Sequence, residues 1–193
     1  PDMKYPERRS RRGVSLPKGQ FLPYLRQHDL LLAYPFQSMN GFVEFLYDAA
    51  DDPEVISIRI TLYRLSNNSK VAAALAYAAD RGKDVLCLLE LRARFDEQNN
   101  IDYSEVLENA GCQVIYGLPD RKVHSKLCLV TRRNGEGVEY FTQVGTGNYN
   151  ETTSEFYTDL SVMTADQSIG RDAAAAFEAL AMGLEPPEAE SLW

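Results

Sequence analysis

A chain of 193 residues in which 45% of the side chains are hydrophobic is long enough to form one domain with a full hydrophobic core. No run of about 18 apolar residues is present, which argues against a membrane span. The net charge of −8 argues against a broad nucleic-acid-binding surface, although a local basic pocket for a polyanion is compatible with it. The single cysteines Cys87, Cys112 and Cys128 lie in apolar surroundings, which predicts reduced thiols in a cytoplasmic protein.

The two ends of the chain differ in composition from its middle. Residues 1–28 contain proline, glycine and a cluster of basic side chains without clear periodicity, which predicts a linker or lead-in. A phosphate-binding arm is the alternative interpretation of this cluster. Residues 29–184 contain the periodic segments and are predicted to form the folded domain. Residues 185–193 predict a tail that leads toward a following domain.

The periodic segments alternate between helices and strands up to about residue 116. Ser69 is a predicted helix N-cap, and Gly82 ends the same helix. The alternation predicts a parallel core with right-handed crossovers, and a hairpin at residues 134–137 then adds antiparallel strands. The fold class is therefore α/β, with a mixed β-sheet flanked by helices. The predicted helices span residues 38–50, 69–81, 102–110 and 166–181, and the predicted strands span residues 55–62, 85–91, 112–116, 125–131, 138–144 and 160–163.

His124 and Lys126 stand two residues apart in the segment Val-His-Ser-Lys-Leu. On an extended strand these two side chains point to the same face. A neutral imidazole can attack phosphorus, and a neighbouring ammonium can hold phosphate oxygens. The Gly-Thr-Gly-Asn stretch at residues 145–148 lets backbone and short polar groups approach the same anion. This pattern predicts a phosphohistidine enzyme, whereas a lone histidine at a strand edge is more often solvated or hydrogen-bonded.

Two arginines and an aspartate extend this candidate site. Arg64 and Arg94 directly follow the first two predicted parallel strands, and ligands of open α/β sheets bind at the carboxyl ends of such strands. Their planar guanidinium groups suit phosphate oxygens, although surface or salt-bridged arginines are the alternative. Asp159 begins a predicted strand and is a candidate acceptor that orients the second ring nitrogen of His124. A turn-associated carboxylate is the alternative for Asp159.

His124, Lys126 and the glycine-rich stretch resemble the phospholipase D superfamily. That pattern normally has an aspartate shortly after the lysine, in the region where this chain has Thr131 and Arg132. A more specific resemblance, carried by several motifs in the right order, is to the first catalytic domain of bacterial polyphosphate kinases of the phosphohistidine type. The motifs that carry it are Leu62-Tyr-Arg64, Leu91 to Glu97, Lys122 to Lys126, Gly145 to Glu151 and Tyr157 to Asp159.

This resemblance implies a phospholipase-D-like mixed sheet over residues 29–184. It also implies an ATP:polyphosphate phosphotransferase, which reversibly transfers the γ-phosphate of ATP to inorganic polyphosphate through a phosphohistidine. His124 is then the phosphorylated residue, and Lys126 and Asp159 complete the catalytic set. The expected partners are ATP, ADP and polyphosphate, without nucleic acid or a membrane span. The expected setting is a homo-oligomeric, longer parent enzyme that is cytoplasmic, with peripheral membrane association left open.

The resemblance also implies how the substrate is held. Arg64, Arg94 and Asn148 match phosphate-binding positions, and Tyr157 matches a nucleotide-contacting position. Mg²⁺ is the implied cofactor, and Arg64 and Arg94 match the positions associated with it. An arginine stays protonated and cannot ligate a metal, so both are expected to contact phosphate oxygens beside Mg²⁺.

Two other functions are compatible with the same residues. A phospholipase-D-like phosphodiesterase or nuclease uses the same histidine nucleophile but needs two such half-sites, which a single half supplies only as a symmetric dimer. A non-catalytic module that binds polyphosphate or nucleotide is the other alternative for this chain on its own.

Overall fold

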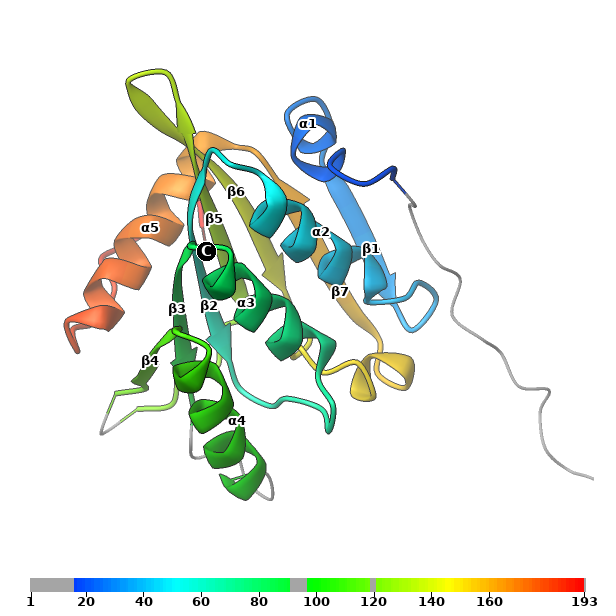
Figure 1. The fold of residues 1–193 in the computed structure, drawn as a ribbon, viewed down its shortest axis with the longest axis vertical. Helices are drawn as coiled ribbons and strands as arrows, with labels where there is room; N and C mark the ends of the chain where they lie inside the picture. Colours follow the sequence, from blue (N-terminus) through cyan, green and yellow to red (C-terminus); the bar gives the residue numbers. More distant parts are fainter. Residues whose placement is uncertain (1–15, 91–96, 119–120, 193) are drawn as a thin grey trace, which may run out of the picture.

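The computed structural model describes residues 16–90, 97–118 and 121–192. These residues form a seven-stranded mixed sheet with the strand order β1-β7-β6-β5-β2-β3-β4 and with helices on both faces (Figure 1). The strands are β1 (Leu30–Tyr34), β2 (Val55–Leu62), β3 (Asp84–Leu89), β4 (Gln113–Tyr116), β5 (Leu127–Asn134), β6 (Gly137–Gly145) and β7 (Asp159–Thr164). The helices are α1 (Phe21–Leu25), α2 (Asn40–Asp51), α3 (Lys70–Asp80), α4 (Glu97–Asn109) and α5 (Gln167–Ala181), with a 3-10 turn, η1 (Thr153–Glu155).

The sheet has a parallel part and an antiparallel part. β2 pairs in parallel with β3, and β3 pairs in parallel with β4, as expected for strands joined by helical crossovers. β5 pairs antiparallel with β2, and β6, β7 and β1 continue the antiparallel part. The β5–β6 hairpin turns at Gly135, whose φ of 61° is readily adopted by glycine. The predicted α/β fold with a mixed sheet is therefore confirmed.

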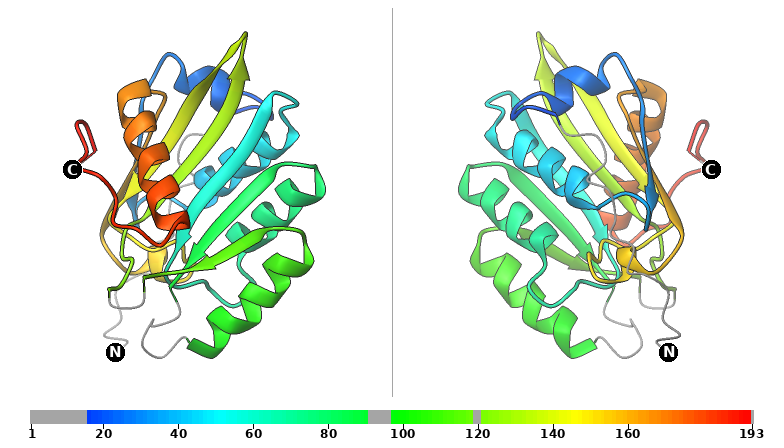
Figure 2. Two further views of the ribbon diagram at one scale, coloured as in Figure 1. Left: turned by 90° about the vertical axis from the view of Figure 1, so that its left-hand side faces the viewer. Right: turned by 90° about the vertical axis from the view of Figure 1, so that its right-hand side faces the viewer.

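Helices cover the two faces unequally. Figure 2 shows α5 on one side of the sheet and α2, α3 and α4 on the other. The larger core lies beneath α2 and α3 and contains the fully buried Phe42, Phe45 and Leu46 of α2. A smaller core beneath α5 contains Phe177 and Leu129. No helix in the described part of the chain has the length and apolar character needed to cross a membrane.

The helix caps agree only in part with the predictions. Ser69 caps α3 by accepting a hydrogen bond from the backbone N–H of Ala72 at 3.2 Å. The first long predicted helix starts at Ser38, but α2 begins at Asn40, with Met39 as its N-cap. The Ser38 hydroxyl accepts instead from the N–H of Asn40 at 3.2 Å. It supports the turn before the helix and is not its cap.

The predicted lead-in over residues 1–28 contains structure that the sequence did not reveal. Phe21, Leu22 and Leu25 of α1 are almost completely buried. The backbone N–H of Phe21 donates to the Asp48 side chain of α2 at 3.1 Å. This part of the lead-in therefore packs on the domain. It was not predicted because a five-residue helix is too short to be identified by periodicity. Residues 1–15 lie outside the described residues.

β1 and the C-terminal tail also depend on contacts that are distant in sequence. β1 has no counterpart among the predicted strands and pairs with β7, from Leu30 opposite Met163 to Tyr34 opposite Asp159. The described part of the predicted tail has no regular secondary structure. Its residue Leu192 nevertheless donates a backbone hydrogen bond to the Asp172 side chain of α5 at 3.0 Å.

Candidate active site

One edge of the sheet collects the candidate residues. The carboxyl ends of β2 and β3 lie at this edge, and the antiparallel pairings bring the start of β5, the end of β6 and the start of β7 to it as well. The N–H of Gly145 donates to the carbonyl of Lys126 at 2.9 Å, and the N–H of Thr146 donates to the carbonyl of Leu160 at 3.0 Å. The His-x-Lys segment, the glycine-rich loop and the start of β7 are therefore joined by backbone hydrogen bonds.

His124 and Lys126 lie just before β5 and contact each other. The Lys126 Nζ is 2.9 Å from the His124 Nδ1, and it also donates to the carbonyl oxygen of His124. Lys126 is buried, whereas the imidazole of His124 is exposed at the surface. Burial lowers the pKa of His124, and the positive charges of Lys126, Arg64 and Lys122 lower it further. These effects favour the neutral imidazole, which is the nucleophilic form.

Tyr63, at the end of β2, is a neighbour of His124 that the sequence did not single out. Its ring meets the imidazole edge-on, with 4.7 Å between centroids and 85° between planes. The Lys126 Nζ lies 5.5 Å from the same ring centroid, and the Arg64 guanidinium carbon lies 5.7 Å from it. An aromatic face attracts both cations. The Tyr63 ring therefore lies close to Arg64, His124 and Lys126. In the sequence, only the motif Leu62-Tyr-Arg64 drew attention to this tyrosine.

Two buried side chains hold the backbone of the histidine segment. The Thr61 hydroxyl donates to the carbonyl of Ser125 at 2.8 Å and accepts from the N–H of Leu127 at 3.1 Å. Glu90, which follows β3, accepts from the N–H of Val123 at 3.0 Å. The segment is thereby anchored on both sides of His124. Neither Thr61 nor Glu90 had a sequence signal, because each acts on a residue more than thirty positions away.

Asp159, at the start of β7, faces the glycine-rich loop. Its Oδ1 accepts a hydrogen bond from the Thr146 hydroxyl at 2.7 Å. Burial lowers the pKa of Lys126, and the negative charge of Asp159 opposes that shift. The Asp159 carboxylate therefore favours the charged form of Lys126. Lys126, in turn, contacts the His124 Nδ1. A direct contact between Asp159 and His124 stays a prediction.

The remaining predicted residues lie in different settings. Asn148 is half-buried, and its Oδ1 is buried without a hydrogen-bond partner among the described residues. The NH₂ group of the same amide can donate to a phosphate oxygen. Tyr157 has 65% of its surface exposed, so its ring is accessible. Arg64 is half-buried beside Tyr63, and Arg94 lies outside the described residues.

The family model described as "Polyphosphate kinase C-terminal domain 1" matches residues 20–186. This chain belongs to the polyphosphate kinase family. A polyphosphate kinase of Lactiplantibacillus plantarum is 41% identical over 186 residues, which cover 96% of this chain and 26% of that relative. This chain thus spans only about a quarter of the length of that curated relative.

Solved structures agree with this membership. The crystal structure of polyphosphate kinase from Porphyromonas gingivalis matches with a TM-score of 0.76 and 37% identity, over 86% of this chain and 28% of that chain. Nuc, a phospholipase D family member from Salmonella typhimurium, matches with a TM-score of 0.60 and 18% identity, over 80% of this chain and 92% of that chain. The second match shows a shared fold, so the predicted phospholipase-D-like architecture is confirmed.

The donor set at this edge of the polyphosphate kinase domain fits phosphate better than a metal. Within the described ranges, no group of three or more His, Cys, Asp or Glu side chains is arranged to hold a metal ion. Magnesium requires oxygen ligands, whereas Arg64 and Lys126 present N–H donors. The described residues therefore form no cage made of protein ligands alone for Mg²⁺, and Arg64 and Lys126 suit phosphate oxygens.

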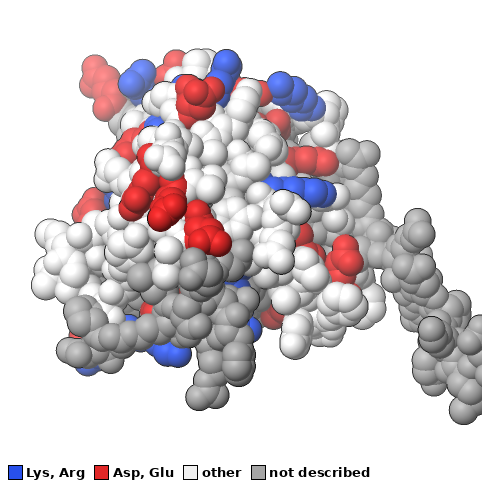
Figure 3. Space-filling model, turned by 60° about the horizontal axis from the view of Figure 1, so that its bottom comes forward, with Lys and Arg blue, Asp and Glu red and all other residues white. Residues whose placement is uncertain are grey.

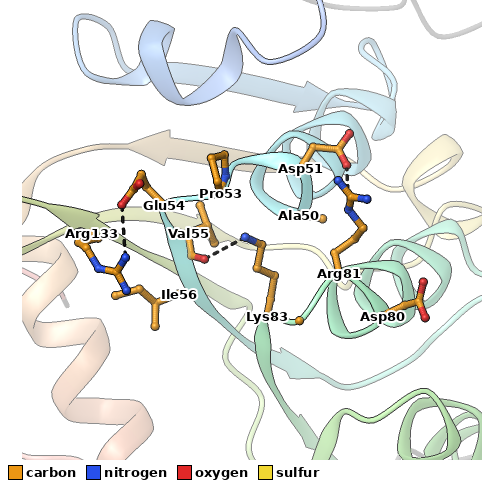
Figure 4. Close-up of a pocket in the computed structure, with 11 residues that line it drawn as sticks. Ala50, Asp51, Pro53, Glu54, Val55, Ile56, Asp80, Arg81, Lys83 and Arg133 are labelled. Carbon is orange, nitrogen blue, oxygen red and sulfur yellow. Dashed lines mark hydrogen bonds and ion pairs between the residues drawn. The ribbon is translucent and has the colours of Figure 1, made fainter.

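Charge on this face of the domain is mixed. On the face that Figure 3 shows, the visible lysines and arginines are scattered among acidic and uncharged side chains. A separate cavity of about 600 Å³ lies at the opposite edge, near the starts of β2 and β3 (Figure 4). There Arg81 pairs with Asp51, and Arg133 pairs with Glu54, each at 3.6 Å. The third lining cation, Lys83, donates to the backbone carbonyls of Asp52 and Val55. Because all three cations already have acceptors, this cavity is not a candidate polyanion site.

Glu151, which follows the glycine-rich loop in the chain, forms hydrogen bonds with the segment after Arg64. Its carboxylate accepts from the hydroxyls of Ser66 and Ser69, and from the N–H of Val71 at 3.0 Å. It therefore lies at the N-terminus of α3, where a negative charge and free N–H groups attract each other. Glu151 ends the motif that runs from Gly145, but its partners are about eighty residues away and only the structure reveals them.

Replacing Glu151 by alanine is expected to lower the free energy of unfolding by about 1–2 kcal/mol, because the N-terminus of α3 and two hydroxyls lose their acceptor. Urea denaturation, followed by circular dichroism, measures the change. Glu155→Ala is the matched control, because Glu155 is exposed in the same loop and is expected to leave the midpoint unchanged. Equal midpoints for the two variants would contradict the role given to Glu151.

Proposed function

We propose that this domain carries the phosphohistidine site of an ATP:polyphosphate phosphotransferase, with His124 as the nucleophile. The observation that carries the proposal is an imidazole whose pKa is lowered by burial and by surrounding cations, with the Lys126 Nζ 2.9 Å from its Nδ1. Cations that keep the nucleophile unprotonated also attract the phosphate chain that it attacks. The names of the relatives support polyphosphate as a substrate.

The reaction proceeds in two displacements at one phosphorus atom. A ring nitrogen of His124 attacks the γ-phosphorus of ATP, an N–P bond forms, and the bond to the bridging oxygen breaks so that ADP leaves. A terminal oxygen of polyphosphate then attacks the same phosphorus, and the N–P bond breaks to restore the imidazole. Both displacements are reversible, so the same site can regenerate ATP from ADP.

The other candidate residues position and neutralise the phosphates. Arg64 and Lys126 spread the charge of the transferring group, which is the main catalytic task in phosphoryl transfer. Asn148 offers its amide to a phosphate oxygen, and the exposed ring of Tyr157 contacts the nucleotide. Arg94 is assigned to phosphate from the sequence resemblance alone. Mg²⁺ enters bound to the phosphates of the nucleotide, as part of the substrate.

The test is to incubate the full-length enzyme that contains this domain with ATP labelled with ³²P at the γ or the α position. The γ label is expected to stay on the protein through denaturation, to be lost in acid and to survive in base, as a phosphoramidate does. The α label is not expected to stay on the protein. Absence of the γ label, together with hydrolysis of a phosphodiester substrate, would favour the phosphodiesterase alternative.

A further inference from the structure

The glycine-rich loop holds the carboxylate of Asp159 by two independent features. The first is a hydrogen bond from the Thr146 hydroxyl to the Asp159 Oδ1 at 2.7 Å. The same hydroxyl accepts from the backbone N–H of Leu160 at 3.0 Å, and the N–H of Thr146 donates to the carbonyl of Leu160 at 3.0 Å. Thr146 is therefore fixed on β7 beside the aspartate, and its hydroxyl is oriented to donate to the carboxylate.

The second feature is the absence of a side chain at Gly147. A Cβ atom at this position would lie 2.5 Å from the Asp159 Oδ2 and 2.6 Å from its Cγ, closer than real Cβ contacts come. Gly147 is not among the glycines with positive φ, so its backbone conformation does not demand glycine. Within the described structure, the close approach of the carboxylate explains why this position has no side chain.

The carboxylate so held is connected electrostatically to the nucleophile. Its charge raises the pKa of Lys126, against the larger effect of burial, and so favours the ammonium form. The Lys126 Nζ in turn lies 2.9 Å from the His124 Nδ1. A displaced Asp159 would leave Lys126 buried without this compensating charge, and a buried uncompensated ammonium is costly.

We propose that Thr146 and Gly147 are positioning residues, which fix the Asp159 carboxylate so that its charge acts on Lys126 beside His124. The inference rests on the phosphohistidine function proposed above and deepens it. It assigns to these two residues of the glycine-rich loop a role toward a side chain of the protein, in addition to any contact of the loop with phosphate. Neither residue needs to touch the reacting atoms.

The test is a double-mutant cycle in the full-length enzyme, measured as the single-turnover rate of γ-³²P transfer to protein. Thr146→Val removes the hydroxyl at almost constant volume and is expected to slow labelling by about tenfold or more. Thr146→Ser retains the hydroxyl and is expected to retain most of the wild-type rate. In an Asp159→Ala background, Thr146→Val is expected to have no further effect, because the group that it positions is already gone.

Thr152→Val is the matched control, because Thr152 is exposed in the following turn and the same substitution there should leave the rate unchanged. Gly147→Ala is expected to slow labelling by about a hundredfold, since the added methyl displaces the carboxylate by a large fraction of an ångström. A wild-type rate in Thr146→Val, or a loss that simply adds to that of Asp159→Ala, would overturn the positioning role. An unlabelled wild-type enzyme would instead overturn the proposed function itself, and this inference with it.

Discussion

Replacing His124 by alanine is expected to abolish phosphoryl transfer in the full-length enzyme, with a loss of at least about 10⁴-fold, as for other covalent nucleophiles. The reason is that the substitution removes the atom that forms the bond to phosphorus and leaves the surrounding cations in place. Substrate binding should therefore fall much less than turnover. Single-turnover labelling with γ-³²P-ATP measures phosphoryl transfer, and equilibrium binding of a non-hydrolysable ATP analogue measures substrate binding.

His28 provides the matched control for this experiment, because it is the other histidine of this chain. It is exposed near α1, with its ring 4.9 Å from that of Tyr24, and it lies in a segment that precedes β1. His28→Ala is expected to keep the wild-type labelling rate. Retained polyphosphate synthesis in His124→Ala would exclude this residue as the nucleophile. Equal losses in the two variants would indicate a general effect on folding.

Replacing Lys126 by methionine is expected to slow labelling by about a hundredfold and to change its pH dependence. The positive charge of Lys126 lowers the pKa of His124, so removing it raises that pKa. The neutral imidazole is the reactive form and predominates above its pKa. The acidic limb of the pH–rate profile should therefore move to higher pH, and the variant should lose proportionally more activity than the wild type as the solution becomes more acidic.

Lys18→Met is the matched control for the lysine substitution. Lys18 is exposed and pairs with Asp51 at 2.7 Å, at the edge of the sheet opposite the candidate site. It should change neither the rate nor the profile, because exposed ion pairs contribute little. A Lys126→Met enzyme whose rate falls without any shift of the acidic limb would show that Lys126 holds phosphate but does not tune His124.

The candidate site could be predicted from the sequence to the extent that its chemistry is local. His124 and Lys126 are two positions apart, and the glycine-rich loop is contiguous, so residue type and spacing indicate phosphate chemistry. The supporting residues could not be found in this way. Thr61 lies on β2 and Tyr63 directly follows it, and both contact a segment about sixty residues later in the chain. Only the antiparallel pairing of β5 with β2 brings them together.

The fold shows the same difference between local features, which could be predicted, and contacts between distant segments, which could not. The α/β class, the four longer helices and six of the seven strands could be predicted from the sequence, because the alternation of apolar residues and the capping residues act over a single turn or strand. β1 and α1 could not be predicted in this way, because they are short and are identified by their contacts with β7 and α2. Nor did the sequence determine that Asp159 is held by Thr146 and acts on Lys126. Those relations depend on strand register, which hydrogen bonds between segments distant in sequence establish.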